Sequence, residues 1–220
     1  MKLALFDLDN TLLDGDSDYC WAQYLIERGV LERGEYERKN DWFYHHYKQG
    51  TLDIHAYLDF QLSPIARRPR EEIDAWHREF MRSKIRPIVH ARTPALLASH
   101  ANDLRAIVTA TNRFITQPIA ADLGVEHLIA CDVEEGPDGR LTGRAKGTPS
   151  FREGKIVRLH EWLAGLGRRF QDFDETWFYS DSLNDLPLLN LVSHPVAVDP
   201  DPTLQRHAEE HGWPILRLRA

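Results

Sequence analysis

Cysteine is scarce in this chain of 220 residues, which has only Cys20 and Cys131, far apart in the sequence. Two distant cysteines cannot build the disulfide framework of a small secreted domain, and they do not form the Cys-x-x-Cys pair of a zinc site. We expect each to be a small buried residue without a partner. The scarcity favours a reducing compartment, most simply the cytoplasm.

Long hydrophobic runs are also absent, since no segment approaches the roughly 20 apolar residues that span a bilayer. Residues 1–9, MKLALFDLD, reach two aspartates before an apolar region of signal-peptide length is complete. There is no surplus of positive charge, because the formal net charge is −7. A nucleic-acid partner is therefore disfavoured. We predict a cytoplasmic protein that binds neither membrane nor nucleic acid.

What the chain does have is enough apolar sequence for a sizeable core, because 42% of its residues are hydrophobic. Short apolar runs that end in polar residues recur along it. Runs of this kind are typical of strands that are covered on both faces of a parallel sheet. The predicted strands cover residues 2–8, 104–109, 128–132, 176–180 and 195–198.

Helical periodicity separates these runs, and the alternation predicts an α/β fold with a doubly wound, Rossmann-like parallel sheet. In such sheets ligands bind beyond the carboxyl ends of the strands. Residues 134–142, EEGPDGRLT, predict a hairpin. The predicted helices of the alternating part cover residues 93–102, 117–123, 155–166 and 183–191.

Residues 15–90 break this alternation. They carry aromatic and aliphatic residues at helical spacing, and Gly50, Pro64 and Pro69 interrupt them. We predict that they form a helical-bundle cap inserted between the first two strands, and that residues 1–14 and 91–220 form the catalytic core.

Carboxylates gather where predicted strands end. The stretch ALFDLDNTLLDGDSD, residues 4–18, runs an apolar strand into Asp7 and Asp9, and Asp181 and Asp185 follow the fourth strand. Clustered carboxylates repel one another unless a cation joins them. Hard oxygen ligands suit Mg²⁺, whereas zinc would call for histidine or cysteine. The sequence therefore predicts a Mg²⁺ site at these strand ends.

Four segments, FDLDNT (6–11), VTATN (108–112), GK (154–155) and SDSLNDLPLL (180–189), stand in this order along the chain. They resemble the four motifs of the haloacid dehalogenase superfamily. The position of the helical insertion resembles the phosphoserine-phosphatase-like branch of that superfamily. The resemblance covers the whole chain. It implies a Mg²⁺-dependent phosphomonoesterase that acts on a small phosphorylated metabolite.

The resemblance also implies a role for each motif residue. Asp7 is the nucleophile and becomes an aspartyl phosphate, while Asp9 acts first as the acid and then as the base. Lys155 neutralises charge on the nucleophile and the phosphoryl group. Asp181 binds Mg²⁺ directly, Asp185 binds it through water, and the backbone carbonyl of Asp9 is a further ligand. The remaining implied contacts to phosphate or substrate are those of Thr109, Ala110, Asn184 and Asp16. Leu8 and Arg113 are further candidates for contact with phosphate or substrate.

Asp16 stands where the phosphoserine phosphatases carry a glutamate that meets the amino group of the substrate. The resemblance therefore implies a substrate with a cationic amine, and some bacterial members of this branch are taken to be histidinol phosphatases. L-histidinol phosphate, or another amino-alcohol or amino-acid phosphate, is the leading candidate.

Two alternatives stay open on the sequence. A phosphotransferase or mutase would share every motif, and a non-enzymatic phospho-aspartate switch would share the acidic cluster, the hydroxyl residue and the lysine. A switch of the receiver type lacks an acid or base two residues after its phosphorylated aspartate. Asp9 and the helical insertion therefore favour the enzyme. The sequence predicts no oligomeric state.

Overall fold

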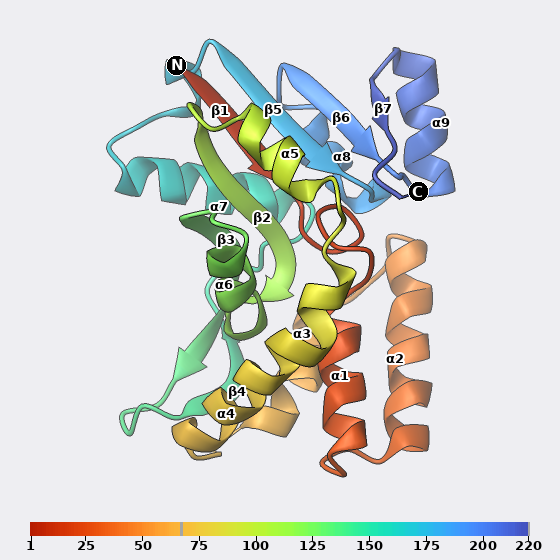
Figure 1. Cartoon of the computed structure of the whole chain (residues 1–220), viewed down its shortest axis with the longest axis vertical. Helices are drawn as coiled ribbons and strands as arrows, with labels where there is room; N and C mark the ends of the chain where they lie inside the picture. Colours follow the sequence, from red (N-terminus) through yellow and green to blue (C-terminus); the bar gives the residue numbers. More distant parts are fainter. Residues whose placement is uncertain (67, 220) are drawn as a thin grey trace.

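A seven-stranded sheet runs through the described part of the chain, residues 1–66 and 68–219 of this computed structural model (Figure 1). The strand order is β4-β3-β2-β1-β5-β6-β7, and all neighbours are parallel except β3 and β4. The predicted α/β fold with a doubly wound sheet is confirmed. The strands are β1 (Lys2–Phe6), β2 (Leu104–Asn112), β3 (His127–Glu135), β4 (Leu141–Lys146), β5 (Glu175–Ser180), β6 (His194–Val198) and β7 (Ile215–Leu216).

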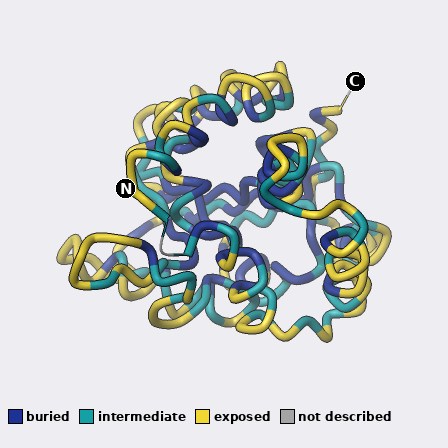
Figure 2. Tube along the Cα trace, turned by 90° about the horizontal axis from the view of Figure 1, so that it is seen from below, coloured by how far each residue is buried: buried dark blue, intermediate teal, exposed yellow. Residues whose placement is uncertain are grey.

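Strand β1 lies in the middle of the sheet, and its residues 3–6 have no exposed surface. Ala4 and Phe6 belong to one hydrophobic cluster, and Leu3 and Leu5 belong to the other. Successive side chains of a strand point to opposite faces, so β1 is covered on both. This double burial explains its continuous apolar run, and Figure 2 shows the buried segments passing through the middle of the fold.

Several strands end elsewhere than predicted. β1 stops at Phe6 instead of residue 8, because the carbonyl of Leu8 already accepts hydrogen bonds from the N–H groups of Leu12 and Leu13 (2.9 and 3.1 Å). β2 continues past the predicted end at residue 109 to Asn112. The predicted hairpin is formed by β3 and β4, whereas the two-residue edge strand β7 was not predicted.

Helices cover both faces of the sheet (Figure 1). The predicted helix over residues 183–191 is shorter than expected, since a 3₁₀ turn (Leu183–Asp185) leads into α8 (Leu186–Leu189), a single α-helical turn. Helix α9 was missed, although Asp201 caps its N-terminus by accepting from the N–H groups of Thr203 and Leu204. The α-helices that follow the insertion between β1 and β2 are α5 (Thr93–Ser99), α6 (Arg113–Asp122), α7 (Glu153–Gly165), α8 (Leu186–Leu189) and α9 (Pro202–His211).

Between β1 and β2 the chain is helical, as predicted. We call residues 15–90 the helical insert; within its described part, α4 continues through a π-helical turn (Met81–Ile85) and a 3₁₀ turn (Arg86–Ile88). Its helices gather at the end of the sheet toward which the arrow of β2 points (Figure 1). Its behaviour as a domain separate from residues 1–14 and 91–220 stays a prediction. The α-helices of the insert are α1 (Ser17–Glu27), α2 (Arg33–Lys48), α3 (Ile54–Leu62) and α4 (Arg70–Phe80).

The chain enters and leaves the helical insert side by side. Leu13 and Val89 form an antiparallel bridge, and the N–H of Asp14 donates to the carbonyl of Ile88 (2.6 Å). A second contact joins β4 to α3. Among the described helices, none is both long and apolar enough to cross a membrane.

Candidate active site

The carboxyl ends of β1, β2 and β5 meet at one edge of the sheet, directly under the helical insert. Phe6 is in register with Ile107 of β2 and with Tyr179 of β5. Asp7 therefore leaves β1 beside the ends of both neighbours, and its N–H donates to the carbonyl of Tyr179 (2.9 Å). Strand order alone brings together residues that are more than a hundred positions apart.

A buried lysine joins two of the predicted carboxylates. Nζ of Lys155, in the first turn of α7, lies 2.8 Å from Oδ1 of Asp7 and 2.7 Å from Oδ1 of Asp185. Burial raises the pKa of Asp7 to about 7, and the charge of Asp185 adds to the rise, while Lys155 opposes it. Burial alone would lower the pKa of Lys155, but the two carboxylates outweigh it and raise that pKa. Lys155 is therefore a permanent positive charge against Asp7.

Asp181 approaches Asp7 from the end of β5. The hydroxyl of Thr11 lies between them, 3.1 Å from Oδ1 of Asp181 and 3.4 Å from Oδ2 of Asp7. Burial raises the pKa of Asp181 well above its usual range, and repulsion from Asp7 and Asp185 adds to the effect. Two carboxylates in this situation favour a cation between them.

The donor set at this point suits Mg²⁺. In the described chain no three side chains of the types Asp, Glu, His and Cys converge closely enough to enclose a metal. Asp185 is engaged with Lys155 and with the hydroxyl of Ser180 (2.6 Å). Asp7 and Asp181 remain, and Mg²⁺ is commonly bound by one or two carboxylates together with water and substrate phosphate. The residues therefore fit Mg²⁺, while the water-mediated role of Asp185 stays a prediction.

Asp9 is held apart from Asp7 by the backbone that follows it. Asn10 has a φ of 58°, a left-handed conformation that asparagine tolerates, and its N–H donates to the carbonyl of Gly15. Oδ1 of Asp9 accepts from the N–H of Ser17 at the start of α1 (2.7 Å), and Oδ2 accepts from the hydroxyl of Thr111 (2.8 Å). Burial raises the pKa of Asp9. A carboxyl group with a raised pKa is suited to donating a proton.

This geometry agrees with what comparison with known proteins finds. Residues 4–190 match the family model of the haloacid dehalogenase-like hydrolases. The chain belongs to this family. It is 48% identical, over 99% of its own length and of the relative's, to the histidinol-phosphatase of Neisseria meningitidis serogroup C. It is 31% identical, over 98% of its length and 70% of the relative's, to the phosphoserine phosphatase SerB1 of Mycobacterium tuberculosis.

Solved structures show the same fold. A protein of unknown function from Bordetella pertussis Tohama I matches with a TM-score of 0.92 and 48% identity over 99% of each chain. A substrate-bound phosphoserine phosphatase matches with a TM-score of 0.67 and 19% identity, over 98% of this chain and 92% of that one. The family and the relatives identify the chain as a phosphatase, which sets aside the alternative of a non-enzymatic switch.

In this haloacid dehalogenase-like phosphatase the residues predicted to bind phosphate come from the loop after β1, from β2 and from the 3₁₀ turn after β5. The hydroxyl of Thr109 lies 3.5 Å from Oδ2 of Asp9 and accepts from the N–H of Thr111 (3.1 Å). Leu8 is fully buried and Ala110 is half-buried. Asn184 donates to the carbonyl of Tyr47 (3.1 Å), and its buried Oδ1 has no hydrogen-bond partner in the described chain. Their roles toward phosphate stay predictions.

The two residues predicted to meet the rest of the substrate are differently placed. Asp16 caps α1 by accepting from the N–H of Tyr19 (2.9 Å), and burial together with the charge of Asp9 raises its pKa to about 7. Arg113 instead pairs with Asp132 of β3 and donates to a backbone carbonyl of the same strand. Its guanidinium is therefore engaged within the protein.

Helix α2 of the helical insert reaches the loop after β5, whereas the sequence predicts Trp42, Phe43 and Tyr47 as bundle core, with one of them as a candidate for lining the pocket. The hydroxyl of Tyr47, near the end of α2, lies 2.8 Å from Oγ of Ser182, and Nη1 of Arg152 donates to the carbonyl of Gly50 (2.6 Å). The aromatic residues around Tyr47 predict a helix but do not determine which of them reaches the site. The contact of Tyr47 with the loop after β5 depends on how the insert packs, so a local pattern could not reveal it.

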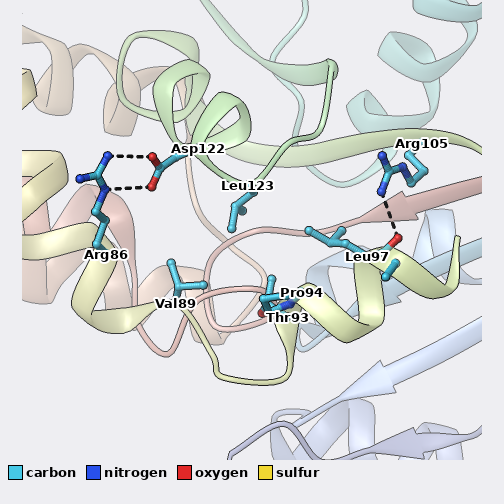
Figure 3. Close-up of a pocket in the computed structure, with 9 residues that line it drawn as sticks. Arg86, Val89, Thr93, Pro94, Leu97, Arg105, Asp122 and Leu123 are labelled. Atoms are coloured by element: carbon cyan, nitrogen blue, oxygen red, sulfur yellow. Dashed lines mark hydrogen bonds and ion pairs between the residues drawn. The ribbon is translucent and has the colours of Figure 1, made fainter. Parts of the chain in front are cut away.

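A pocket of about 520 Å³ lies between α5 and α6 (Figure 3). None of the site residues lines it. Its two arginines are engaged, because Arg86 pairs with both oxygens of Asp122 and Arg105 donates to the carbonyl of Leu97. We assign it no part in the chemistry.

Proposed function

We propose that this phosphatase hydrolyses L-histidinol phosphate, or another amino-alcohol or amino-acid phosphate, through a phosphorylated Asp7 and with Mg²⁺. The observation that carries the reaction is the environment of Asp7. Nζ of Lys155 lies 2.8 Å from its Oδ1, Asp181 shares the hydroxyl of Thr11 with it, and Asp9 follows two residues later. The full-length 48% identity to a histidinol-phosphatase supports the substrate.

Residues of the chain act in both steps of the proposed reaction, the phosphorylation of Asp7 and the hydrolysis of the aspartyl phosphate. A carboxylate oxygen of Asp7 attacks phosphorus, and the bond from phosphorus to the ester oxygen breaks. Asp9 donates a proton to the leaving alkoxide and later takes one from the water that attacks the phosphoryl group on Asp7. Lys155 faces the charge that accumulates on Asp7 and the phosphoryl oxygens. Hydrolysis restores Asp7 and releases inorganic phosphate.

Asp7 and Asp181 would hold Mg²⁺, with the backbone carbonyl of Asp9 as a further ligand. When bound, Mg²⁺ supplies positive charge that offsets the repulsion between carboxylate and phosphate. Without that charge the site would bring the carboxylates of Asp7 and Asp181 against the phosphate, with the buried Lys155 as the one cation beside Asp7.

The charges near Asp16 favour an ammonium group on the substrate. The neighbours that raise the pKa of Asp16 and Asp18 by repulsion are themselves aspartates, including Asp9. An ammonium group would offset this negative charge. A substrate carboxylate would need an arginine, and Arg113 is already paired with Asp132. The site therefore suits histidinol phosphate better than phosphoserine.

A panel of phosphate esters with Mg²⁺ tests this proposal by the phosphate that is released. L-histidinol phosphate, phosphoserine, glycerol 3-phosphate and p-nitrophenyl phosphate differ in amine, carboxylate and leaving group. We expect the highest kcat/KM for L-histidinol phosphate. Equal or higher values for glycerol 3-phosphate, which has no amine, would contradict the substrate class.

The variant Asp16→Asn tests the amine contact directly. Loss of one charge pair is expected to raise KM for L-histidinol phosphate about tenfold, equivalent to about 1.4 kcal/mol, with less effect on p-nitrophenyl phosphate. Asp14→Asn is the matched control, because Asp14 is exposed and pairs with Arg219 (2.9 Å). A KM for L-histidinol phosphate that is the same in both variants would speak against Asp16.

A phosphotransferase or mutase on the same core predicts a different product balance. A phosphatase releases one inorganic phosphate for each alcohol, whereas a transferase passes part of the phosphate to an acceptor. Measuring both products, with and without added alcohols, separates the two functions.

A further inference from the structure

A buried hydrogen-bonded path leads from Asp9 into the helical insert. Thr111, near the end of β2, lies with its hydroxyl 2.8 Å from Oδ2 of Asp9 and 3.3 Å from Oδ2 of Asp18 in α1. Asp18 is 2% exposed and Thr111 is 6% exposed. The hydroxyl of Thr111 therefore lies between the half-buried carboxylate of Asp9 and the buried carboxylate of Asp18.

The path continues through α3 to α2. The hydroxyl of Tyr57 donates to Asp18 (3.3 Å), and Nε2 of Gln61 donates to that hydroxyl (2.8 Å). Oε1 of Gln61 in turn accepts from the hydroxyl of Tyr36 (2.9 Å). From Tyr36 to Asp18 the donors follow one direction, from α2 through α3 to α1. Buried networks whose members are all satisfied hold their side chains in one arrangement.

Folding alone does not explain Asp18. It shares one face of α1 with the buried residues Trp21, Ala22 and Leu25, at the spacing i, i+3, i+4 and i+7 of a core-facing stripe. An apolar side chain would fit that stripe, and a buried carboxyl group is costly there. The cost is reduced because Asn112 donates to Oδ1 of Asp18 (3.3 Å) while Thr111 and Tyr57 contact Oδ2. A polar group is thus maintained where packing favours an apolar one.

We infer that Thr111 and Asp18 are positioning residues for Asp9, and that through Tyr57 they tie the orientation of its carboxylate to the packing of the helical insert. This inference rests on the proposed function, in which Asp9 is the acid and base. Thr111 donates its single hydroxyl proton to Oδ2 of Asp9, the nearer oxygen at 2.8 Å, and Oδ2 of Asp18 flanks the same hydroxyl at 3.3 Å. Displacing a catalytic group by about 1 Å can reduce a rate about a hundredfold, so this support has a measurable effect.

The first test compares Thr111→Val with Thr111→Ser on two esters. Valine keeps the shape but removes the hydroxyl, and serine keeps the hydroxyl. With the alkyl ester that the wild type hydrolyses fastest, we expect Thr111→Val to lower kcat about 10- to 100-fold with little change in KM, since acid–base catalysis contributes about 10²- to 10⁴-fold. The rate of nitrophenolate release in the first turnover of p-nitrophenyl phosphate should fall much less, because that leaving group needs no proton. Thr111→Ser should restore the alkyl ester rate.

The control is Thr176→Val, which removes a buried hydroxyl at the start of β5, where its partner is Ser193. It should leave the ratio of the two rates unchanged. An equal loss on both esters for Thr111→Val, or no recovery in Thr111→Ser, would overturn the inference, because either result indicates general damage to the site.

A second pair of variants tests the link to the insert. Tyr57→Phe removes the one donor that α3 supplies to Asp18 in the described chain, whereas Tyr24→Phe removes a hydroxyl that contacts Glu79 at the surface of the insert. We expect Tyr57→Phe to lower the ratio of alkyl to aryl rates in the same direction as Thr111→Val, and Tyr24→Phe to leave it unchanged. Identical ratios in Tyr57→Phe and wild type would overturn the link.

Crystal structures of the wild type and Thr111→Val provide a readout that does not depend on turnover. We expect the Asp9 carboxylate to leave its wild-type position in the variant, and an unmoved carboxylate would overturn the inference. If the wild type hydrolysed none of the esters, the proposed function would fail while these structures still decided whether Thr111 positions Asp9.

Discussion

Replacing Lys155 by methionine is expected to destabilise the fold more than an ion-pair loss usually does. Nζ of Lys155 lies 2.8 Å from Asp7 and 2.7 Å from Asp185, and the side chains of the lysine and of Asp185 are each 3% exposed. Methionine fills similar space but carries no charge. Its introduction leaves two buried carboxylates next to each other without their cation.

The magnitude follows from these distances. One pair of unit charges at 2.7 Å gains about 6 kcal/mol at an effective dielectric constant of about 20. Part of that gain is offset, because the variant no longer has to bury an ammonium group. Breaking a buried pair by removing one partner costs about 3 to 5 kcal/mol. We therefore expect Lys155→Met to lower the free energy of unfolding by about 4 kcal/mol at pH 8 in EDTA.

Urea denaturation followed by tryptophan fluorescence measures this loss. Lys2→Met is the matched control, since Nζ of Lys2 also lies 2.8 Å from a carboxylate, that of Glu175, but 48% of its side chain is exposed. Exposed pairs contribute about 0 to 1 kcal/mol, so the control should change little. A loss in Lys155→Met no larger than in Lys2→Met would refute the argument that burial makes the Lys155 pairs strong.

Four further predictions concern Asp7, Asp9 and the metal. Asp7→Asn should abolish turnover while circular dichroism stays unchanged, and activity within about tenfold of wild type, about 1.4 kcal/mol in barrier, would show that Asp7 is not the nucleophile. Activity should need Mg²⁺ and be inhibited by Ca²⁺, which takes more ligands at longer distances; full activity in EDTA would contradict the metal site. With p-nitrophenyl phosphate, Asp9→Asn should release a burst of about one equivalent of nitrophenolate and keep a phosphorylated Asp7 that mass spectrometry can detect. A wild type with an equally long-lived phosphoenzyme would contradict the acid–base role of Asp9. In EDTA the melting temperature should fall as pH rises from about 5 to 7. Burial raises the pKa of Asp7 from 3.8 to about 7, so over this range the folded state holds a proton that the unfolded state has released. A melting temperature that rises over this range would contradict the shift in the pKa of Asp7.

The residues of β2 show how far the sequence could be interpreted correctly. The apolar run at 104–109 predicted the strand, and the polar residues after it predicted its end, yet β2 continues to Asn112. Thr111 and Asn112 are buried against Asp18 of α1, which supplies the polar contacts that water would otherwise make. A residue's polarity predicts exposure only while no distant polar partner covers it. The same reason applies to Tyr47, whose partner Ser182 lies 135 positions away.

The sequence by itself determined the α/β class, the helical insertion after the first strand and the meeting of Asp7 with Asp181, because apolar runs and strand-end motifs are local signals that the rules of parallel sheets convert into one place. The role of Lys155 beside Asp7 was implied by the resemblance to the haloacid dehalogenase motifs. Only the tertiary structure decided which polar side chains support that cluster. Periodicity places Asp18 on the buried face of α1, but its partners Tyr57, Thr111 and Asn112 come from α3 and β2. Hydrogen bonds between such distant segments depend on how the helical insert packs on the sheet, and no local pattern records that packing.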